Sequence, residues 1–190
     1  MSAQPLRKQQ LVEAAIEEIG ATGSLNVTVG KIAKRAGVSA ALAFHYFGDK
    51  DTLFLAAMRH VLAIYGAEVR GALVASDGPR ERLDAIIRAN FSPTNFRAEV
   101  IAAWLNFYVL AQRSPQARRL LSVYHRRLQS NLVYNLRPLV GNTAPEIATR
   151  LGGLIDGIYL RFAVNPDDTT GKSAAAQVLT TLDHELRALT

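Results

Sequence analysis

The chain has 190 residues, of which 49% are hydrophobic and 20% are charged, which suits a sizeable core in one or two small domains. It contains no cysteine, and this excludes a disulfide framework, a cysteine-based metal site and thiol chemistry. The net charge of +6 favours an acidic or polyanionic partner.

Other function classes lack their sequence signals. None of the histidines has a second histidine three or four residues away, so we expect no helical zinc motif, and no cofactor is indicated. No apolar run reaches the roughly 18 residues of a membrane span, because Asp156 and Arg161 interrupt the best candidate. The N-terminus lacks the apolar block of a signal peptide, so we expect a cytoplasmic protein without membrane contact.

The elements expected in chain order are all helices, so the sequence predicts an all-α fold. The first runs from Leu6 to Ile19 and ends at Gly20 and Gly23. Two short helices follow, and then one long helix from Asp49 to about Val74. Prolines and glycines divide the rest into helices at about 79–91, 97–113, 115–137, 145–164 and 171–189.

Residues 27–53 carry the most specific pattern, two short helices joined by a tight turn. Asn26 or Thr28 can cap the first helix, and Ser39 can cap the second. Gly37 stands where the first helix must stop. This spacing is typical of a helix-turn-helix, whose second helix enters the DNA major groove, and also of an ordinary corner between two helices.

The residues of this segment resemble the tetracycline-repressor (TetR) family. The matching positions are Thr28, Ile32, Ala33, Ala36, Gly37, Val38, Ser39, Phe44, His45, Tyr46, Phe47, Asp49, Lys50 and Leu53. The resemblance implies about nine helices, with a DNA-binding domain at 1–50 and a larger ligand-binding and dimerisation domain at 51–190. Ala41 and Phe44 depart from the usual pattern, and Phe44 has no hydroxyl to offer to DNA.

DNA contact is expected from the turn, the second helix and the start of the long helix. Lys50, Tyr46 and Thr28 can contact phosphates. The second helix has no Arg, Asn or Gln, so base reading should depend on apolar contact with thymine methyls and on His45. The predicted DNA-contacting residues are Thr28, Ser39, Ala40, Ala41, Leu42, Phe44, His45, Tyr46 and Lys50, with Lys31, Lys34 and Arg35 outside the groove.

The two C-terminal helices have apolar faces that can pair with those of a second copy. Gly153 and Gly157 lie four residues apart and would allow a close approach of helix backbones. Two such helices from each of two chains can form a four-helix bundle, as the resemblance also implies; alternatively, both faces are buried within one chain. The predicted interface residues are Gly153, Gly157, Ile158, Leu182 and Leu186, with Leu189 at the end of the same stripe.

The larger domain at 51–190 resembles one subgroup of this family. The runs ANFSPTNF (89–96), AAWLNFY (102–108), RRLQSNL (126–132) and LIDGIYLR (154–161) are similar to TetR repressors that control glycine betaine synthesis from choline, the BetI-like subgroup. The resemblance implies choline as inducer and a role in osmoprotection. A quaternary ammonium is held by aromatic faces, usually with a carboxylate nearby.

The ligand residues expected on this basis are aromatic, amide and acidic. They are Asn90, Phe91, Trp104, Phe107, Tyr108, Asp156 and Tyr159, with Glu99 as another possible charge and Asn106 as another amide. The aromatic stripe can also be plain core, and Asp156 can instead pair with an arginine. The alternatives are a TetR-type repressor that answers a lipophilic cation or a metabolite acid, a small all-α enzyme, or a purely structural helical protein. No nucleophile, metal or paired-carboxylate motif supports an enzyme.

Overall fold

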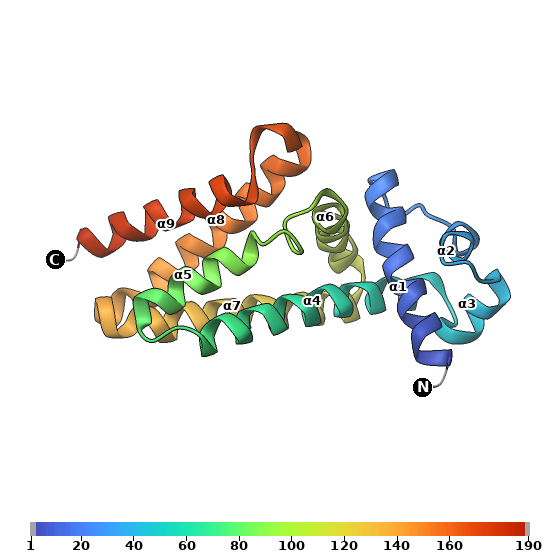
Figure 1. The fold of residues 1–190 in the computed structure, drawn as a ribbon, viewed down its shortest axis with the longest axis horizontal. Helices are drawn as coiled ribbons and strands as arrows, with labels where there is room; N and C mark the ends of the chain where they lie inside the picture. Colours follow the sequence, from blue (N-terminus) through green and yellow to red (C-terminus); the bar gives the residue numbers. More distant parts are fainter. Residues whose placement is uncertain (1–2, 189–190) are drawn as a thin grey trace. The chain divides into compact units, whose positions relative to one another are not determined.

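The structure is a computed structural model that describes residues 3–188. These residues form nine α-helices and two short 3₁₀ helices without a strand, which confirms the all-α prediction (Figure 1). Their contacts divide into two compact units. Within the described residues, unit 1 takes the chain up to Ala63 together with Ala98–Leu120, and unit 2 takes Ile64–Arg97 and the chain from Leu121 onward.

Unit 1 surrounds its first helix. Its elements are α1 (Ala3–Thr22), α2 (Val29–Arg35), α3 (Ala40–Phe47), the first half of α4 (Lys50–Val74), α6 (Ala98–Arg113) and the beginning of α7 (Pro115–Val140). Helix α1 packs against α2 and α3 on one side and against α6 on the other (Figure 1). Since α6 belongs to this unit, the packing does not follow a division at residue 50, and the predicted limit of the DNA-binding domain stays a prediction.

Helix α1 is longer than predicted because Gly20 does not end it. The helix continues to Thr22, and Gly23, with φ of +60°, takes the left-handed conformation after it. A Cβ atom added at Gly20 would lie 2.6 Å from the Cα atom of Glu99 in α6. Gly20 therefore serves the close approach of two helices.

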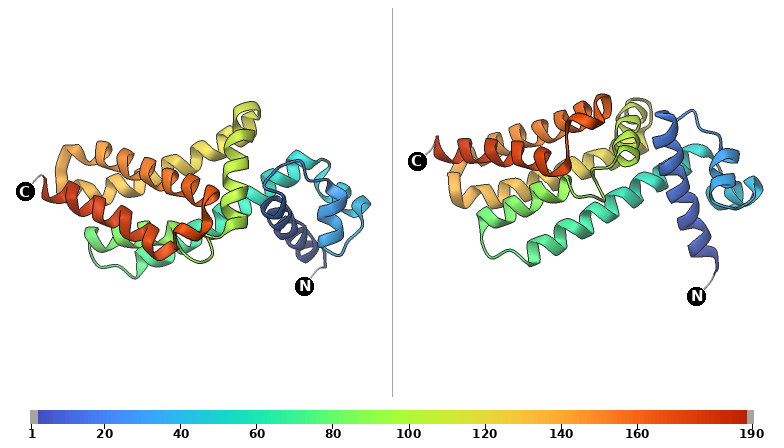
Figure 2. Two further views of the ribbon diagram at one scale, coloured as in Figure 1. Left: turned by 90° about the horizontal axis from the view of Figure 1, so that it is seen from above. Right: turned by 45° about the horizontal axis from the view of Figure 1, so that its top comes forward.

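Unit 2 contains the remaining helices. They are the second half of α4, α5 (Pro79–Asn90), the rest of α7, α8 (Ala144–Val164) and α9 (Gly171–Arg187), with 3₁₀ turns at Gly141–Thr143 and Pro166–Asp168. Helix α9 packs against both α5 and α8, and α8 and α9 lie side by side in both views of Figure 2. The core of this unit includes Leu83, Ile86, Leu151, Ile155 and Leu182, each fully buried.

Helix α7 does not end before Pro138, as the sequence prediction had it, but continues to Val140. Proline has no N–H, so the carbonyl of Tyr134 loses its usual helical partner. The Tyr134 residue is 71% exposed, which leaves this carbonyl near water. The helix tolerates the proline because the lost bond falls on a solvent-facing turn near its end.

The expectation that no segment is apolar enough to span a membrane needs correction at α4. By length and composition alone, this helix meets the requirement within the described chain, with a mean hydropathy of 1.3. Part of its apolar surface is core: Leu53, Phe54 and Met58 are no more than 3% exposed. A core helix of a helical protein passes the same test of length and composition, so α4 is weak evidence for a membrane span.

Candidate functional site

The helix-turn-helix predicted at residues 27–53 is confirmed in its local geometry. The Thr28 hydroxyl oxygen accepts a hydrogen bond from the Lys31 amide at 3.2 Å, and the Ser39 hydroxyl oxygen accepts one from the Leu42 amide at 3.2 Å. Gly37 has φ of +68°, a left-handed conformation that glycine adopts without strain. Each helix therefore begins at a side-chain cap, and a glycine follows the end of the first.

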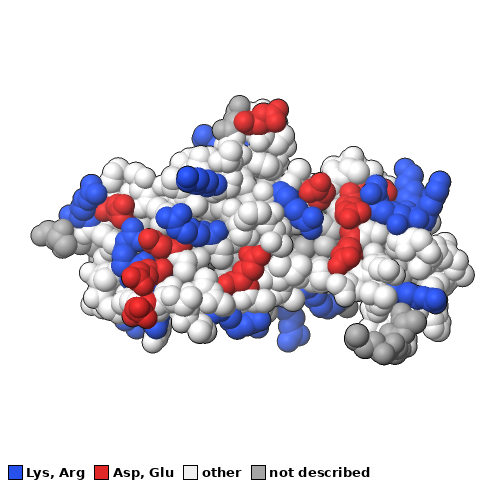
Figure 3. Space-filling model, viewed as in Figure 1, with Lys and Arg blue, Asp and Glu red and all other residues white. Residues whose placement is uncertain are grey.

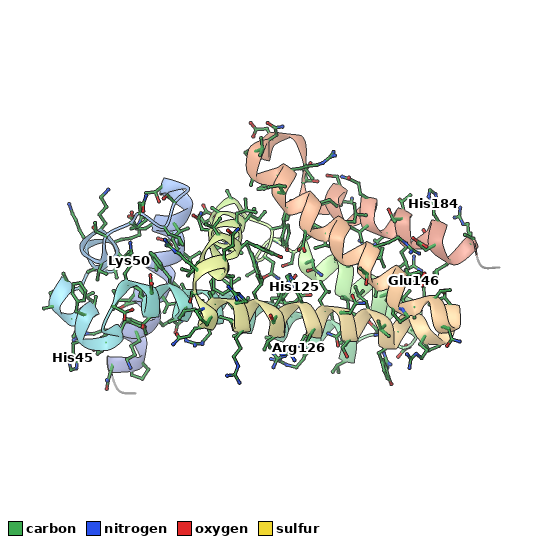
Figure 4. The ribbon with its side chains drawn as sticks, turned by 180° about the vertical axis from the view of Figure 1, so that it is seen from behind. His45, Lys50, His125, Arg126, Glu146 and His184 are labelled. Atoms are coloured by element: carbon green, nitrogen blue, oxygen red, sulfur yellow. The ribbon has the colours of Figure 1, made fainter. Side chains whose placement is uncertain are left out.

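Helix α3 exposes one face and buries the other. Ser39, Ala40, Ala41 and His45 are exposed, and Phe44 keeps 50% of its surface in solvent. Leu42, Tyr46 and Phe47 are half-buried and Ala43 is buried. Figure 4 shows His45 on this helix and Lys50 near the start of α4. The exposed face is small and neutral except for His45 and the Phe44 ring, so it offers apolar contact more than hydrogen bonds.

Lys50 is held by its own unit. Its Nζ donates to the carbonyl of Leu25 at 3.2 Å and lies 5.7 Å from the centre of the Phe54 ring. The ammonium has three protons, so one bond to a carbonyl leaves donors for a phosphate. The structure thus places Lys50 at the start of α4 with a fixed direction, and its role in DNA contact stays a prediction.

Basic side chains surround the two short helices unequally. Lys31 and Lys34 are exposed, and Figure 3 shows lysine and arginine side chains gathered over α2 beside acidic ones. Arg35 is bound to Glu18 at 2.6 Å and to Glu17 at 3.4 Å, and these carboxylates raise the pKa of its guanidinium. Its charge is therefore largely neutralised within unit 1.

One basic residue near the DNA-binding helices was missed by the sequence reasoning. The Nζ atom of Lys8, from α1, lies 5.5 Å from the centre of the Tyr46 ring. The only sequence signal was the pair Arg7–Lys8 at the beginning of the first helix, which is not specific.

The predicted ligand residues fall into two groups. Trp104, Phe107 and Tyr108 lie on α6 of unit 1, where Trp104 is 5% exposed and its ring centre is 6.3 Å from that of Tyr108. The other four belong to unit 2 and are Asn90, Phe91, Asp156 and Tyr159.

Unit 2 holds a cluster of four aromatic rings. The ring centre of Phe91 is 5.2 Å from that of Phe96 and 5.7 Å from that of Tyr159. The Phe96 ring stacks on Tyr159 at 5.6 Å and contacts Phe162 at 4.4 Å. We call these four residues the aromatic cluster. Phe96 was not among the predicted ligand residues, although it ends the run 89–96 that carries the resemblance.

Three tyrosines meet at Asn90, whose side chain is fully buried. The Tyr124 hydroxyl donates to its Oδ1 at 3.4 Å, and the Tyr159 hydroxyl donates to its backbone carbonyl. Tyr65 is also hydrogen-bonded to Asn90; burial raises the pKa of the Tyr65 hydroxyl, and the bond to Asn90 opposes that rise. Asn90 therefore orients the tyrosines that surround it.

The predicted charge partner, Asp156, lies beside a histidine. Its Oδ2 is 3.9 Å from the Nε2 of His125, and both side chains are partly exposed. Figure 4 shows His125 on α7, from which it reaches α8. The proximity forms an ion pair only when the imidazole is protonated.

The outward side of α8 carries the predicted glycines. Added Cβ atoms at Gly153 and Gly157 would meet nothing within 4 Å, so no other part of the chain packs closely there. Leu160 and Val164 continue this stripe at helical spacing, with 56% and 71% of their surfaces exposed.

The other predicted interface residues point into the chain or lie near its end. Ile158 and Leu182 are 5% and 0% exposed, and Leu186 is half-buried. Leu189 lies outside the described residues.

An open hollow of about 540 Å³ lies between α5 and α7 in unit 2. Its lining residues are Pro79, Arg82, Ser130, Val133, Tyr134, Asn135, Arg137 and Pro138. With two arginines and no carboxylate in this lining, the hollow does not suit a cation.

An all-α chain with a capped helix-turn-helix, whose second helix is open to solvent, has the architecture of helix-turn-helix DNA-binding proteins. Residues 11–57 match the family described as bacterial regulatory proteins, tetR family, and residues 79–187 match the BetI-type transcriptional repressor, C-terminal family. The chain therefore belongs to the TetR family and has a C-terminal region of the BetI type.

Curated relatives agree over most of the chain. The HTH-type transcriptional regulator BetI of Brucella anthropi is 52% identical over 92% of this chain and 91% of its own length. The regulator of the same name from Agrobacterium fabrum is 46% identical over 97% of this chain and 90% of its own.

Solved structures share the fold. A putative transcriptional regulator from Pseudomonas aeruginosa PAO1 has a TM-score of 0.79 at 27% identity, over 100% of this chain and 96% of its own. A putative transcriptional regulator from Saccharomonospora viridis, solved in complex with choline, has a TM-score of 0.83 at 22% identity, over 96% and 97% of the two chains.

Proposed function

We propose that this chain is a cytoplasmic repressor that binds its operator as a homodimer, is released by choline, and controls genes of glycine betaine synthesis. It acts by binding, without catalysis. The observation that carries the proposal is the BetI-type match over residues 79–187, which span all the ligand residues expected from the sequence. The Saccharomonospora viridis regulator, which shares this fold, was solved with choline, which supports the choice of ligand.

The aromatic residues suit a quaternary ammonium. Such a cation cannot donate a hydrogen bond, and each good aromatic face contributes about 0.5–2 kcal/mol. In unit 2 we propose Phe91 and Tyr159 as faces, with Asn90 as the residue that orients Tyr159. In unit 1 we propose Trp104, Phe107 and Tyr108 on α6. Asp156 remains a proposed source of negative charge.

For DNA, we propose that the exposed face of α3 enters the major groove. Ala40, Ala41, Leu42, Phe44 and His45 would meet the base edges. The hydroxyls of Thr28, Ser39 and Tyr46 and the ammonium of Lys50 would meet phosphates. A two-fold dimer places two such helices about 34 Å apart, one turn of the duplex.

For the dimer, we propose that the stripe of Gly153, Gly157, Leu160 and Val164 on α8 packs against the same stripe of a second copy. An apolar stripe this exposed on one helix needs a partner, and two glycines without near neighbours allow a backbone to approach. Ile158, Leu182 and Leu186 would support the interface from beneath, because their side chains pack inside unit 2 or at its edge.

The test is operator binding with and without choline. Fluorescence anisotropy on labelled promoter fragments from beside the gene should show sequence-selective binding that weakens when millimolar choline is added. Choline should also quench the fluorescence of Trp104, the single tryptophan. Trp104→Ala should keep operator binding and lose the choline response.

Different failures separate the alternatives. Selective DNA binding that ignores choline but responds to a lipophilic cation or a metabolite acid would replace the effector and keep the repressor. A chain that binds no promoter fragment would overturn the proposal.

A further inference from the structure

We propose that Glu68 on α4 is the carboxylate that balances the positive charge of the effector in unit 2. The inference rests on the proposed function, because it assumes a cationic effector, and it names a residue that the sequence patterns did not single out. Two observations on the described residues support this role: side chains that donate hydrogen bonds to Glu68, and the lack of a cationic side chain paired with it.

Glu68 is held in place by the run that follows α5. The Ser92 hydroxyl donates to its Oε2 at 2.7 Å, and the Nδ2 of Asn95 donates to the same atom at 2.6 Å. Asn95 is only 4% exposed, and its Nδ2 also donates to the carbonyl of Ala89 at 2.9 Å. A buried amide and a hydroxyl thus fix one carboxylate oxygen, and hydrogen bonds to an ionised group are among the stronger ones.

Two groups of aromatic residues lie near Glu68, or near the residues that hold it, in the sequence. Tyr65 precedes Glu68 by three residues on α4, one turn away, and its ring packs edge-on against Tyr124 at 5.6 Å. Phe91 directly precedes Ser92 and Phe96 directly follows Asn95 in the sequence, and both rings pack against Tyr159. Aromatic faces with an anchored carboxylate are the features that recognise a quaternary ammonium.

Glu68 has no counter-charge of its own. Among the described residues, no Lys, Arg or His forms an ion pair with it within 4.0 Å. Its second oxygen, Oε1, accepts no hydrogen bond from the described residues. A carboxylate that is held in place, has one oxygen without a hydrogen bond and pairs with no cation is suited to bind a cation.

Asp156 meets these conditions less well. It lies 3.9 Å from His125, which competes for its charge when protonated. The run 89–96, ANFSPTNF, also gains a physical explanation. Asn90 orients the tyrosines, Ser92 and Asn95 hold Glu68, and Phe91 and Phe96 supply rings to the aromatic cluster.

The test compares choline with its uncharged isostere, 3,3-dimethylbutan-1-ol, in calorimetric titrations of the full chain. Wild type should prefer choline. Glu68→Gln keeps a carbonyl oxygen that can accept from Ser92 and Asn95, so the loop should stay in place. This variant should bind choline about tenfold or more weakly, while its affinity for the neutral isostere should not change.

Two further variants sharpen the test. Ser92→Ala should weaken choline binding less than Glu68→Gln, because Asn95 still holds the carboxylate. Glu146→Gln is the matched control, an equal loss of charge at an exposed position on α8 in the same unit, and should leave the preference for choline intact.

The contrary results are distinct. Glu68→Gln with wild-type choline affinity, or with equal losses for choline and the neutral isostere, would overturn the role of Glu68 and leave the proposed function standing. Wild type that binds no choline at all would overturn both.

Discussion

The helix-turn-helix of unit 1 and the aromatic cluster of unit 2 are built in opposite ways. The first is a single stretch of chain in which Thr28 and Ser39 cap their own helices through hydrogen bonds to amides three residues later. The second draws its rings from the segment after α5 and from α8, and Asn90 beside it accepts hydrogen bonds from tyrosines 34 and 69 positions away. The first could be predicted from the sequence because its contacts are local. The second could not, because its residues are distant in the sequence and meet only in the folded chain.

The two regions also differ in exposure, and this follows from their proposed tasks. A surface that reads DNA must stay open, and the outer face of α3 does so with Phe44 at 50% exposure. Faces that select a cation gain strength away from water, and Phe91, Phe96 and Tyr159 are 4%, 7% and 6% exposed. The comparison predicts that substitutions in unit 2 change DNA binding only indirectly, through the dimer or the effector.

Gly157→Leu should produce the largest effect of this indirect kind. A Cβ atom added at Gly157 meets nothing within 4 Å in its own chain, so folding should survive, while the proposed face toward a second copy is blocked. Loss of the second half-site should lower operator affinity about 100-fold. Sedimentation should show a monomer, and anisotropy should show the weaker binding.

The matched control is Gly71→Leu, at an exposed position on α4 that is equally free of neighbours. It should leave the dimer unchanged. A Gly157→Leu protein that remains dimeric with wild-type affinity would remove α8 from the interface.

Gly20→Ala should destabilise unit 1 directly. The new methyl would lie 2.6 Å from the Glu99 backbone, and such overpacking costs about 1–3 kcal/mol. The better helix propensity of alanine returns about 1 kcal/mol, so the net loss should be up to about 2 kcal/mol. Urea unfolding measures it, with Gly71→Ala as the control that should gain stability. Equal gains in both variants would mean that α1 and α6 are not closely packed at Gly20.

What the sequence predicted follows the same division. Helix periodicity and caps are local, so the all-α fold, the cap at Ser39 and the turn at Gly37 were predicted, and Thr28 was one of two residues named for the other cap. The end of α1 was wrong because Gly20 looks like a stop signal until Glu99 is seen against it. The end of α7 was wrong because Pro138 is tolerated on a solvent-facing turn.

Partners distant in sequence could not be inferred from it. Asp156 was weighed as a possible arginine partner, yet it lies beside His125, because only folding brings α7 and α8 together there. Glu68 had no sequence signal, since nothing local links it to Ser92 and Asn95 more than 20 residues later.

Ser39→Ala in unit 1 should have a smaller effect, and comparison with a cap in unit 2 should again show a difference between the two units. Loss of an N-cap costs about 1 kcal/mol. Because α3 is short and is the proposed reading helix, operator affinity should fall as well. Thr170→Ala removes a comparable cap from α9 in unit 2, where the Thr170 side chain accepts from the Ser173 amide. Thr170→Ala should lower the free energy of unfolding in urea by a similar amount. At protein concentrations where the chain is dimeric, it should change DNA affinity little. Equal losses of operator affinity in the two variants would contradict the division of tasks.

The smallest expected effect is a pH dependence at the junction before α4. Asp49 Oδ1 accepts the Thr52 amide at 2.7 Å, and this hydrogen bond lowers the pKa of the Asp49 carboxyl below its ordinary value of 3.8. A lowered pKa in the folded state means that the carboxylate contributes stability above the unfolded value, and that this contribution is lost as pH falls through the folded pKa. Urea midpoints measured from about pH 5 downward should therefore fall less steeply in Asp49→Asn, which keeps a neutral oxygen acceptor at the cap. Glu185→Gln in unit 2 gives the parallel measurement, since the Arg150 guanidinium lowers the pKa of the Glu185 carboxyl. If Asp49→Asn and wild type lose stability along the same curve, the cap at Asp49 does not depend on charge.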